Sequence, residues 1–151
     1  MLMKYVNRMG VRLWAVVIIL SIAAPLSAQL FAPKSELERQ FDRAVSSYEK
    51  EHYEEALQSF QDLYEHHRGF PLTTATHLML VKTYYRLGLE RKSLNFGKQF
   101  TAQYPHSGYL DDIHFAMAET YYALEEYRNS AYAYVYAILK SGDQALARMA
   151  L

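Results

Sequence analysis

The segment YALEEYRNSAYAY, at Tyr122–Tyr134, has two altered copies earlier in the chain, YRLGLERKSLNFG at 85–97 and YEKEHYEEALQSF at 48–60. Successive copies are 37 residues apart. The same shift aligns further positions: Tyr48, Tyr85 and Tyr122; Glu51, Gly88 and Glu125; Ala56, Ser93 and Ser130; Ala44, Val81 and Ala118. A fixed period of this length is typical of proteins that stack helical units. The copies therefore predict an all-α repeat architecture.

Apolar residues recur at helical spacing along most of the chain, as in Leu78, Val81 and Tyr85. Groups of helix-breaking residues interrupt this pattern at RGFP (68–71), Gly88, YPHSG (104–108) and SGD (141–143). They divide the chain into paired helices of roughly 14–17 residues. We also expect Ser107 and Gly142 to cap helix ends.

Small residues at the aligned positions predict how the two helices of a unit pack. Ala44 and Ala118 come late in the first helix of their units, and Ala56, Ser93 and Ser130 come early in the second. Such residues let two helices approach closely. Bulky residues in the second helix then close the pair, with Tyr53 and Phe60 in the first copy and Tyr127 and Tyr134 in the third.

These residues resemble the tetratricopeptide repeat over about residues 37–142. The paired tyrosines, the turn glycine and the Tyr-Glu-Glu-Ala-Leu segment at 53–57 carry the resemblance. The chain departs from the family in its period, which in the family is about 34 residues, and in Ser93, Ser130 and Gly97. The resemblance implies a right-handed superhelical solenoid of antiparallel helix pairs. Its three repeats would span about 37–73, 74–110 and 111–142, with a capping or fourth-repeat helix starting in 143–151.

A narrower resemblance lies in FTAQYPHSGYLDDIHFAMAETYYALEEY, at 100–127. This stretch is similar to repeats of exported bacterial envelope proteins, of the outer-membrane β-barrel assembly lipoprotein and Tol-Pal coordinator types. The chain has no cysteine, so it lacks the lipid-attachment cysteine of the first type. It also has no thiol for a disulfide or a thiolate metal site.

The N-terminus has the order of a secretory signal peptide. Lys4, Arg8 and Arg12 precede the apolar run LWAVVIIL at 13–20, and small residues follow at Ser27 and Ala28. We predict a signal peptide at 1–28, cleaved after Ala28, with retention as an uncleaved anchor as the alternative. Residues 29–36 form a polar lead. Cleavage would leave no membrane span and a periplasmic or secreted protein.

The charge balance argues against nucleic acid as a partner. The whole chain has 16 basic and 16 acidic residues. Removing 1–28 takes away three basic residues and no acidic ones, which leaves a net charge of −3. Phosphate binding needs a basic surface that such a chain does not supply.

Histidines are the first candidates for chemistry. His66 and His67 are adjacent, so on a helix their side chains point about 100° apart and do not share one metal ion easily. A polar helix end explains them better. His77 and His114 are 37 residues apart, which favours a structural position in the repeat over a ligand.

His106, Ser107 and Asp111 contain the residue types of a hydrolase. No G-x-S-x-G elbow accompanies them, and a turn followed by a helix cap is the simpler interpretation. We therefore expect a protein that is not an enzyme, with no catalytic, cofactor-binding or metal site.

The tetratricopeptide resemblance implies a concave groove lined by the first helix of each pair. Tyr48, Tyr85 and Tyr122 would form a row suited to an extended or helical peptide, or would pack partly between helices. Lys82 and Arg86 lie one turn apart, where they meet an acidic group of a ligand or remain solvated. The residues carried over as a partner-binding groove are Phe41, Tyr48, Leu78, Lys82, Tyr85, Arg86, Asp112, Phe115, Glu119 and Tyr122, together with Val45 and Glu49.

The last residues are apolar at Leu146, Met149 and Leu151, whereas the final helix of a solenoid needs a polar outer face. We expect this end to be covered by a partner, a second copy or further chain. The sequence thus favours an exported scaffold that binds a protein or peptide partner in the bacterial envelope. The alternative is an N-terminal targeting or oligomerisation module of a longer envelope protein.

Overall fold

The computed structural model describes residues 34–67 and 69–141, and within these ranges it contains helices and no strand. The helices of the described residues lie in the compact unit that begins at Glu36. They are α2 (Glu36–Glu49), α3 (Tyr53–His66), α4 (Thr73–Arg86), α5 (Glu90–Gln103), α6 (Leu110–Ala123) and α7 (Tyr127–Ser141). The predicted all-α class is confirmed for these residues.

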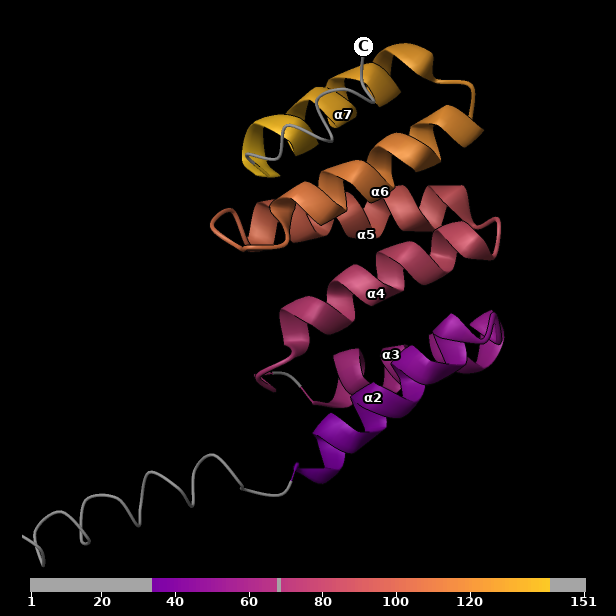
Figure 1. The fold of residues 1–151 in the computed structure, drawn as a ribbon, viewed down its shortest axis with the longest axis vertical. Helices are drawn as coiled ribbons and strands as arrows, with labels where there is room; N and C mark the ends of the chain where they lie inside the picture. Colours follow the sequence, from indigo (N-terminus) through magenta and orange to yellow (C-terminus); the bar gives the residue numbers. More distant parts are fainter. Residues whose placement is uncertain (1–33, 68, 142–151) are drawn as a thin grey trace, which may run out of the picture. The chain divides into compact units, whose positions relative to one another are not determined.

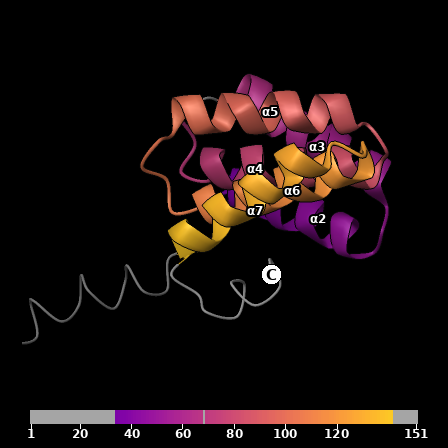
Figure 2. The ribbon, with the colours of Figure 1, turned by 90° about the horizontal axis from the view of Figure 1, so that it is seen from above.

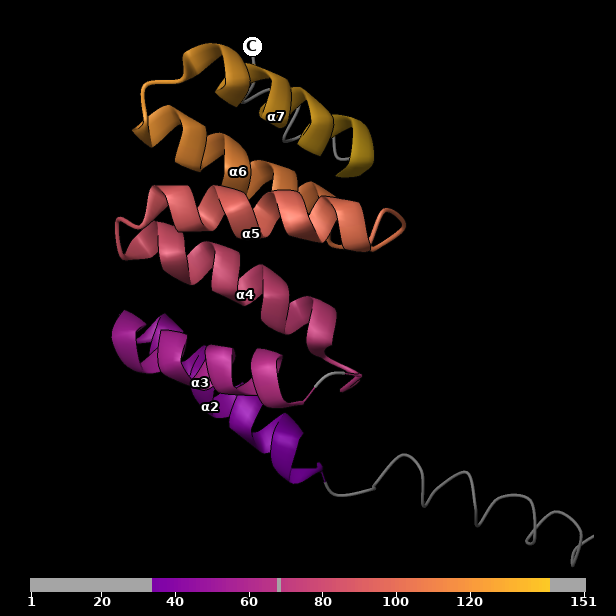
Figure 3. The ribbon, with the colours of Figure 1, turned by 180° about the vertical axis from the view of Figure 1, so that it is seen from behind.

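Each helix packs against the next one along the chain, and α4 also contacts both α2 and α6. Figures 1 and 3 show the helices following one another in chain order from α2 to α7, seen from the front and from behind. Figure 2, seen from above, places α5 to one side of α4 and α6. The first helices of the pairs, α2, α4 and α6, therefore form a row of direct neighbours.

The helix boundaries recur every 37 residues. The first helices begin at Glu36, Thr73 and Leu110, and the second helices begin at Tyr53, Glu90 and Tyr127. The turn inside each pair contains one residue in the left-handed conformation, with φ of 63° at Glu51, 66° at Gly88 and 60° at Glu125. The aligned glycine and glutamates therefore share one backbone position, which glycine adopts without strain.

The small residues of the pattern are buried between the helices of a pair, as predicted. Ala56, Ser93 and Ser130 are at most 3% exposed. The Ser93 hydroxyl donates to the carbonyl of Val81 at 2.9 Å, and the Ser130 hydroxyl donates to the carbonyl of Ala118 at 2.9 Å. Serine therefore replaces alanine here without leaving its hydroxyl unpaired in the core.

Two clusters of buried side chains hold the row together. Phe60, Leu80 and Tyr84 belong to the first cluster, and Phe100 and Met117 to the second.

Met117 accounts for the glycine at position 97, one of the positions where the chain departs from the tetratricopeptide pattern. A β-carbon at that position would lie 2.7 Å from Cγ of Met117. Met117 thus occupies the space that an aromatic residue at 97 would need, and the two positions compensate for each other.

The predicted cap at Ser107 is wrong. Helix α6 begins at Leu110, its N-cap position is Tyr109, and no side chain caps it. The Ser107 hydroxyl instead accepts a hydrogen bond from the Tyr109 N–H at 3.2 Å, within the preceding turn.

Several predictions fall outside the described residues: the signal peptide at 1–28, most of the polar lead, the cap at Gly142 and the segment 143–151. No helix among the described residues has the length and apolarity to span a membrane.

Candidate partner-binding groove

Side chains of α2, α4 and α6 line a groove with a volume of about 640 Å³. Because the three helices are direct neighbours, residues far apart in the sequence meet in it. Helix α2 supplies Val45, Tyr48 and Glu49; α4 supplies Met79, Lys82, Tyr85 and Arg86; and α6 supplies Asp111, Asp112, Phe115, Ala116 and Glu119.

Nine of the twelve residues named for the groove line it: Val45, Tyr48, Glu49, Lys82, Tyr85, Arg86, Asp112, Phe115 and Glu119. The other three lie elsewhere. Leu78 is 5% exposed and belongs to the core. The Phe41 ring packs edge-on against Phe60 at 5.8 Å. Tyr122 is 62% exposed and packs edge-on against Tyr127 at 5.5 Å.

The different positions of Leu78 and Phe115 show what the pattern leaves open. These two residues are 37 apart and occupy the same place on their helices. Leu78 is covered because it packs in a cluster with Leu110 and Ile113 of α6. Phe115 lies on α6, the first helix of the third pair. Within the described residues no first helix of a further pair follows to cover it, and it lines the groove.

Three lining residues were not named from the sequence: Met79, Ala116 and Asp111. Met79 and Ala116 are 37 residues apart and add to the apolar part of the lining. The repeat pattern alone did not identify them, because Asp42, the α2 residue aligned with Met79 and Ala116, does not line the groove.

The two cations of the groove have different environments. The Lys82 ammonium lies 3.3 Å from a carboxylate oxygen of Asp112 and so joins α4 to α6. The Arg86 guanidinium instead lies over the Tyr53 ring, 5.6 Å from its centroid. The phenol groups of Tyr53 and Tyr48 raise the pKa of Arg86 above its usual value. No carboxylate of the described residues forms an ion pair with Arg86 within 4.0 Å.

The aromatic pair beside Arg86 is itself ordered by packing. The rings of Tyr48 and Tyr53 meet edge-to-face at 5.3 Å. Burial raises the pKa of Tyr48, so its hydroxyl remains protonated and able to donate near neutral pH. Arg86 and Tyr48 together offer a cation and a hydroxyl donor at one end of the groove.

Glu119 is held on the other side of the groove by α7. Its carboxylate accepts a hydrogen bond from the hydroxyl of Tyr134. Burial and this bond raise the pKa of Tyr134, which keeps the tyrosine as the donor and Glu119 as the acceptor. Asp111 and Asp112 add two carboxylates to the α6 side. The groove is thus cationic and aromatic at Arg86 and acidic along α6.

The candidate histidines occupy different environments. His77 is fully buried, and its Nε2–H donates to the Phe96 carbonyl at 2.9 Å. His114 is half-buried against the Tyr136 ring, with centroids 4.8 Å apart. Within the described ranges, no three His, Asp or Glu side chains are placed to hold a metal ion together.

No model of a known protein family matches the chain, and a search among curated proteins finds no sequence that matches it. The functional argument therefore rests on the geometry of the groove.

Proposed function

We propose that this protein is an exported tetratricopeptide-type scaffold that binds a partner protein in the bacterial cell envelope. The observation that carries the proposal is the groove, in which three helices that are not consecutive present aromatic, apolar and charged side chains to one space. Concave sites of this size and mixed lining are typical of ligand recognition.

The proposal includes the finer architecture, three helix pairs in a right-handed superhelical solenoid. It is supported by the 37-residue recurrence of the helix starts and of the left-handed turn residue. The repeated serine bonds to Val81 and Ala118 support it as well.

The groove favours an extended or helical peptide segment that carries an apolar side chain and an acidic group. Met79 and Phe115 offer apolar contacts, and a ligand carboxylate would pair with Arg86. Tyr48 and Tyr85 offer large rigid faces with a polar tip, which bind at low cost in side-chain entropy. Lys82 contributes indirectly, because its ion pair with Asp112 fixes the spacing of α4 and α6.

A double substitution tests the groove. Tyr85→Ala with Arg86→Ala should lower the capture of partner from envelope extract at least tenfold, because both contacts at the cationic end are lost. Lys98→Ala with Gln99→Ala is the matched control, since both residues are exposed on α5 and neither lines the groove. Helical circular dichroism should be the same for all three proteins. Equal capture by the two variants would count against the groove, and loss of helicity would show that the pair is structural.

Export is tested separately by mass spectrometry of the protein recovered from cell fractions. The proposal expects a periplasmic or secreted protein that begins at Gln29. A full-length chain in the membrane fraction would indicate a retained anchor. A full-length chain in the cytosol would overturn the export proposal and leave the groove untouched.

A further inference from the structure

Helix α7 carries an apolar stripe on its exposed side. We define the α7 stripe as Tyr132, Val135, Tyr136 and Leu139, which are 61%, 49%, 54% and 75% exposed. Their spacing of three, four and seven residues places them along one face of the helix. A stripe of this pattern fits a second helix laid along it.

The corresponding residues of the earlier second helices are polar or small. In α5 they are Asn95, Lys98, Gln99 and Ala102, all exposed. In α3 they are Gln58, Gln61, Asp62 and Glu65, three of them exposed and Gln61 half-buried. These positions are mostly exposed, and where α2 or α4 reaches them in α3 the contacts are polar, from Gln40 to Asp62 and from Gln61 to Tyr84. Helix α7 differs from its own copies in placing large apolar groups there.

The stripe is large enough to be an interface. An exposed tyrosine ring of this kind contributes on the order of 100 Å² of surface, so two tyrosines, a valine and a leucine expose several hundred Å². The largest contiguous apolar patch of a typical monomer has about this size and is often a functional site.

Further helices stacked in the same way would not cover the stripe. Helix α6 packs on α5 and buries Leu94, yet Asn95, Lys98, Gln99 and Ala102 of α5 remain exposed. A further helix pair that followed α7 as α6 and α7 follow α5 would cover Ala131, the counterpart of Leu94. It would touch the stripe only at its edge, as the Tyr121 ring of α6 lies 5.9 Å from the ammonium of Lys98, the counterpart of Val135. A partner that covers the α7 stripe must therefore approach from a direction other than the one in which the helix pairs stack.

We propose that the α7 stripe is a two-fold interface between two copies of this chain. If the two α7 helices run antiparallel about an axis between Val135 and Tyr136, Tyr132 meets Leu139 of the second copy and Val135 meets Tyr136. Every tyrosine then faces an aliphatic side chain, and large groups oppose smaller ones, as helix packing requires. The same patch serves on both copies, so the assembly closes as a dimer. The four stripe residues carry no charge, and the guanidinium of Arg128 lies over the Tyr132 ring, 5.8 Å from its centroid.

The dimer goes beyond the proposed groove function and does not rest on it. No residue of the α7 stripe lines the groove. Each dimer would therefore carry two grooves, and a partner with two binding segments would gain from effective concentration.

The first test replaces the stripe by the residues of α5, which this fold keeps in solvent: Tyr132→Asn, Val135→Lys, Tyr136→Gln and Leu139→Ala. Light scattering should find a dimer for the wild-type protein at ~100 µM, above the Kd of a small interface, which is on the order of micromolar. The grafted variant should associate at least tenfold more weakly with unchanged helicity. Tyr122→Asn, which removes an equally exposed tyrosine outside the stripe, should remain dimeric.

The second test uses the absence of cysteine from the chain. Val135→Cys should form a disulfide-linked dimer under mild oxidation, because the residue lies beside the proposed axis. Arg43→Cys, at a position 65% exposed on α2, should not. A monomeric wild-type protein at every concentration overturns the proposal, whether the stripe is then found on lipid vesicles, on another protein or under residues 142–151. Equal cross-linking of the two variants overturns it as well. If the grafted variant loses helicity, the cysteine variants decide.

Discussion

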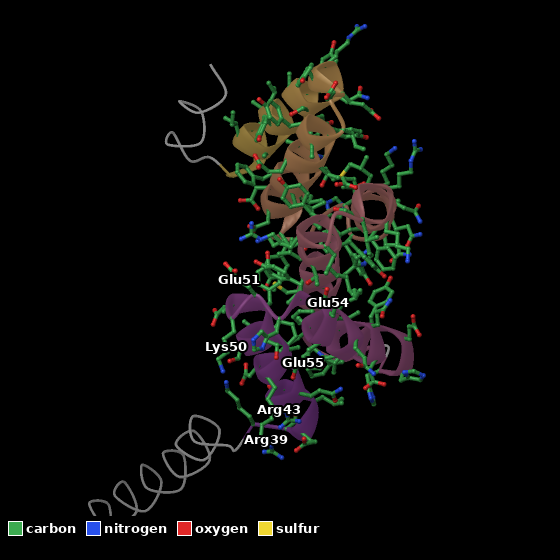
Figure 4. All side chains as sticks on the ribbon, turned by 90° about the vertical axis from the view of Figure 1, so that its right-hand side faces the viewer. Arg39, Arg43, Lys50, Glu51, Glu54 and Glu55 are labelled. Carbon is green, nitrogen blue, oxygen red and sulfur yellow. The ribbon has the colours of Figure 1, made fainter. Side chains whose placement is uncertain are left out.

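The two ends of the helical unit share one repeat pattern and have opposite surfaces. At the α2 end, Glu36 pairs with Arg39 at 2.8 Å and with Arg43 at 2.9 Å. Figure 4 labels these two arginines on α2, with Lys50, Glu51, Glu54 and Glu55 around the turn into α3. At the α7 end, the exposed residues include large apolar side chains of tyrosine, valine and leucine. The repeat therefore determines where a helix begins and which side is buried, while each copy varies what it presents outward.

The groove shows the same division. Val45, Lys82 and Glu119 are 37 residues apart and all line it, yet they are apolar, cationic and anionic. One backbone position thus carries three chemistries. A ligand that follows the groove from α2 to α6 meets a different group on each helix, which gives a repeated backbone a direction.

The largest expected loss of stability comes from buried side chains, and it should differ between the two ends. Phe60 in the first pair and Tyr134 in the last are 74 residues apart, at equivalent positions. Phe60 is fully buried, so Phe60→Ala should lower the free energy of unfolding by about 3–5 kcal/mol. Tyr134 is only half-buried, and Tyr134→Ala should cost about 2 kcal/mol, from partial packing and the lost bond to Glu119. Urea denaturation followed by circular dichroism measures both. Equal losses would mean that the two ends are equally well packed.

Periodicity was enough to predict the helices, the turn at Gly88 and its aligned positions, and the buried serines. It was not enough for residues whose environment depends on the next helix. Leu78 and Phe115 are equivalent in sequence but differ in burial. Helix α6 covers Leu78 of α4, whereas Phe115 lies on α6 itself and lines the groove. The ion pair of Lys82 with Asp112 joins residues 30 apart, and only the relative placement of α4 and α6 reveals it. Ser107 was misassigned as a cap because α6 begins later than the turn residues suggested.

The second prediction concerns the middle of the unit, between the two ends. Burial lowers the pKa of His77 below 6.5, and the bond to the Phe96 carbonyl opposes this only in part. The Nδ1 atom is buried without a partner, and the titratable side chains facing the ring are Tyr64 and Tyr104. Because the folded-state pKa lies below the unfolded one, stability is fully present above pH 6.5 and falls as the pH drops below it.

His77→Gln should flatten the loss of stability between pH 7 and pH 5, because glutamine does not titrate. Thermal unfolding at several pH values measures the slope. His106→Gln is the control, since His106 is exposed in a loop and its removal should leave the slope as in the wild type. A slope that persists in His77→Gln would assign the pH dependence to other groups.

Substitutions in the turns should have a smaller effect on stability, and the same gain is expected at both ends. Glu51 and Glu125 adopt the left-handed conformation that Gly88 adopts in the central copy. A non-glycine residue is strained there, so Glu51→Gly and Glu125→Gly should each stabilise the fold by about 1 kcal/mol, and Gly88→Ala should cost about as much. Melting temperatures should shift by a few degrees. A destabilised Glu51→Gly would mean that this side chain contributes more than its backbone strain costs.

The smallest stability effects return to the outer faces, where the two ends differ most. Arg43→Ala removes an exposed ion pair, and Leu139→Ala removes a side chain that is 75% exposed. Neither change should be resolved in a denaturation curve of the monomer at low protein concentration, because solvent screens the ion pair of Arg43 and the Leu139 side chain is already mostly in solvent. Raising the protein concentration should separate them, since Leu139→Ala alone would lose the stabilisation that association provides. A loss of stability in dilute Leu139→Ala would instead place that side chain against its own chain, and α7 would then resemble α2 in needing no second copy.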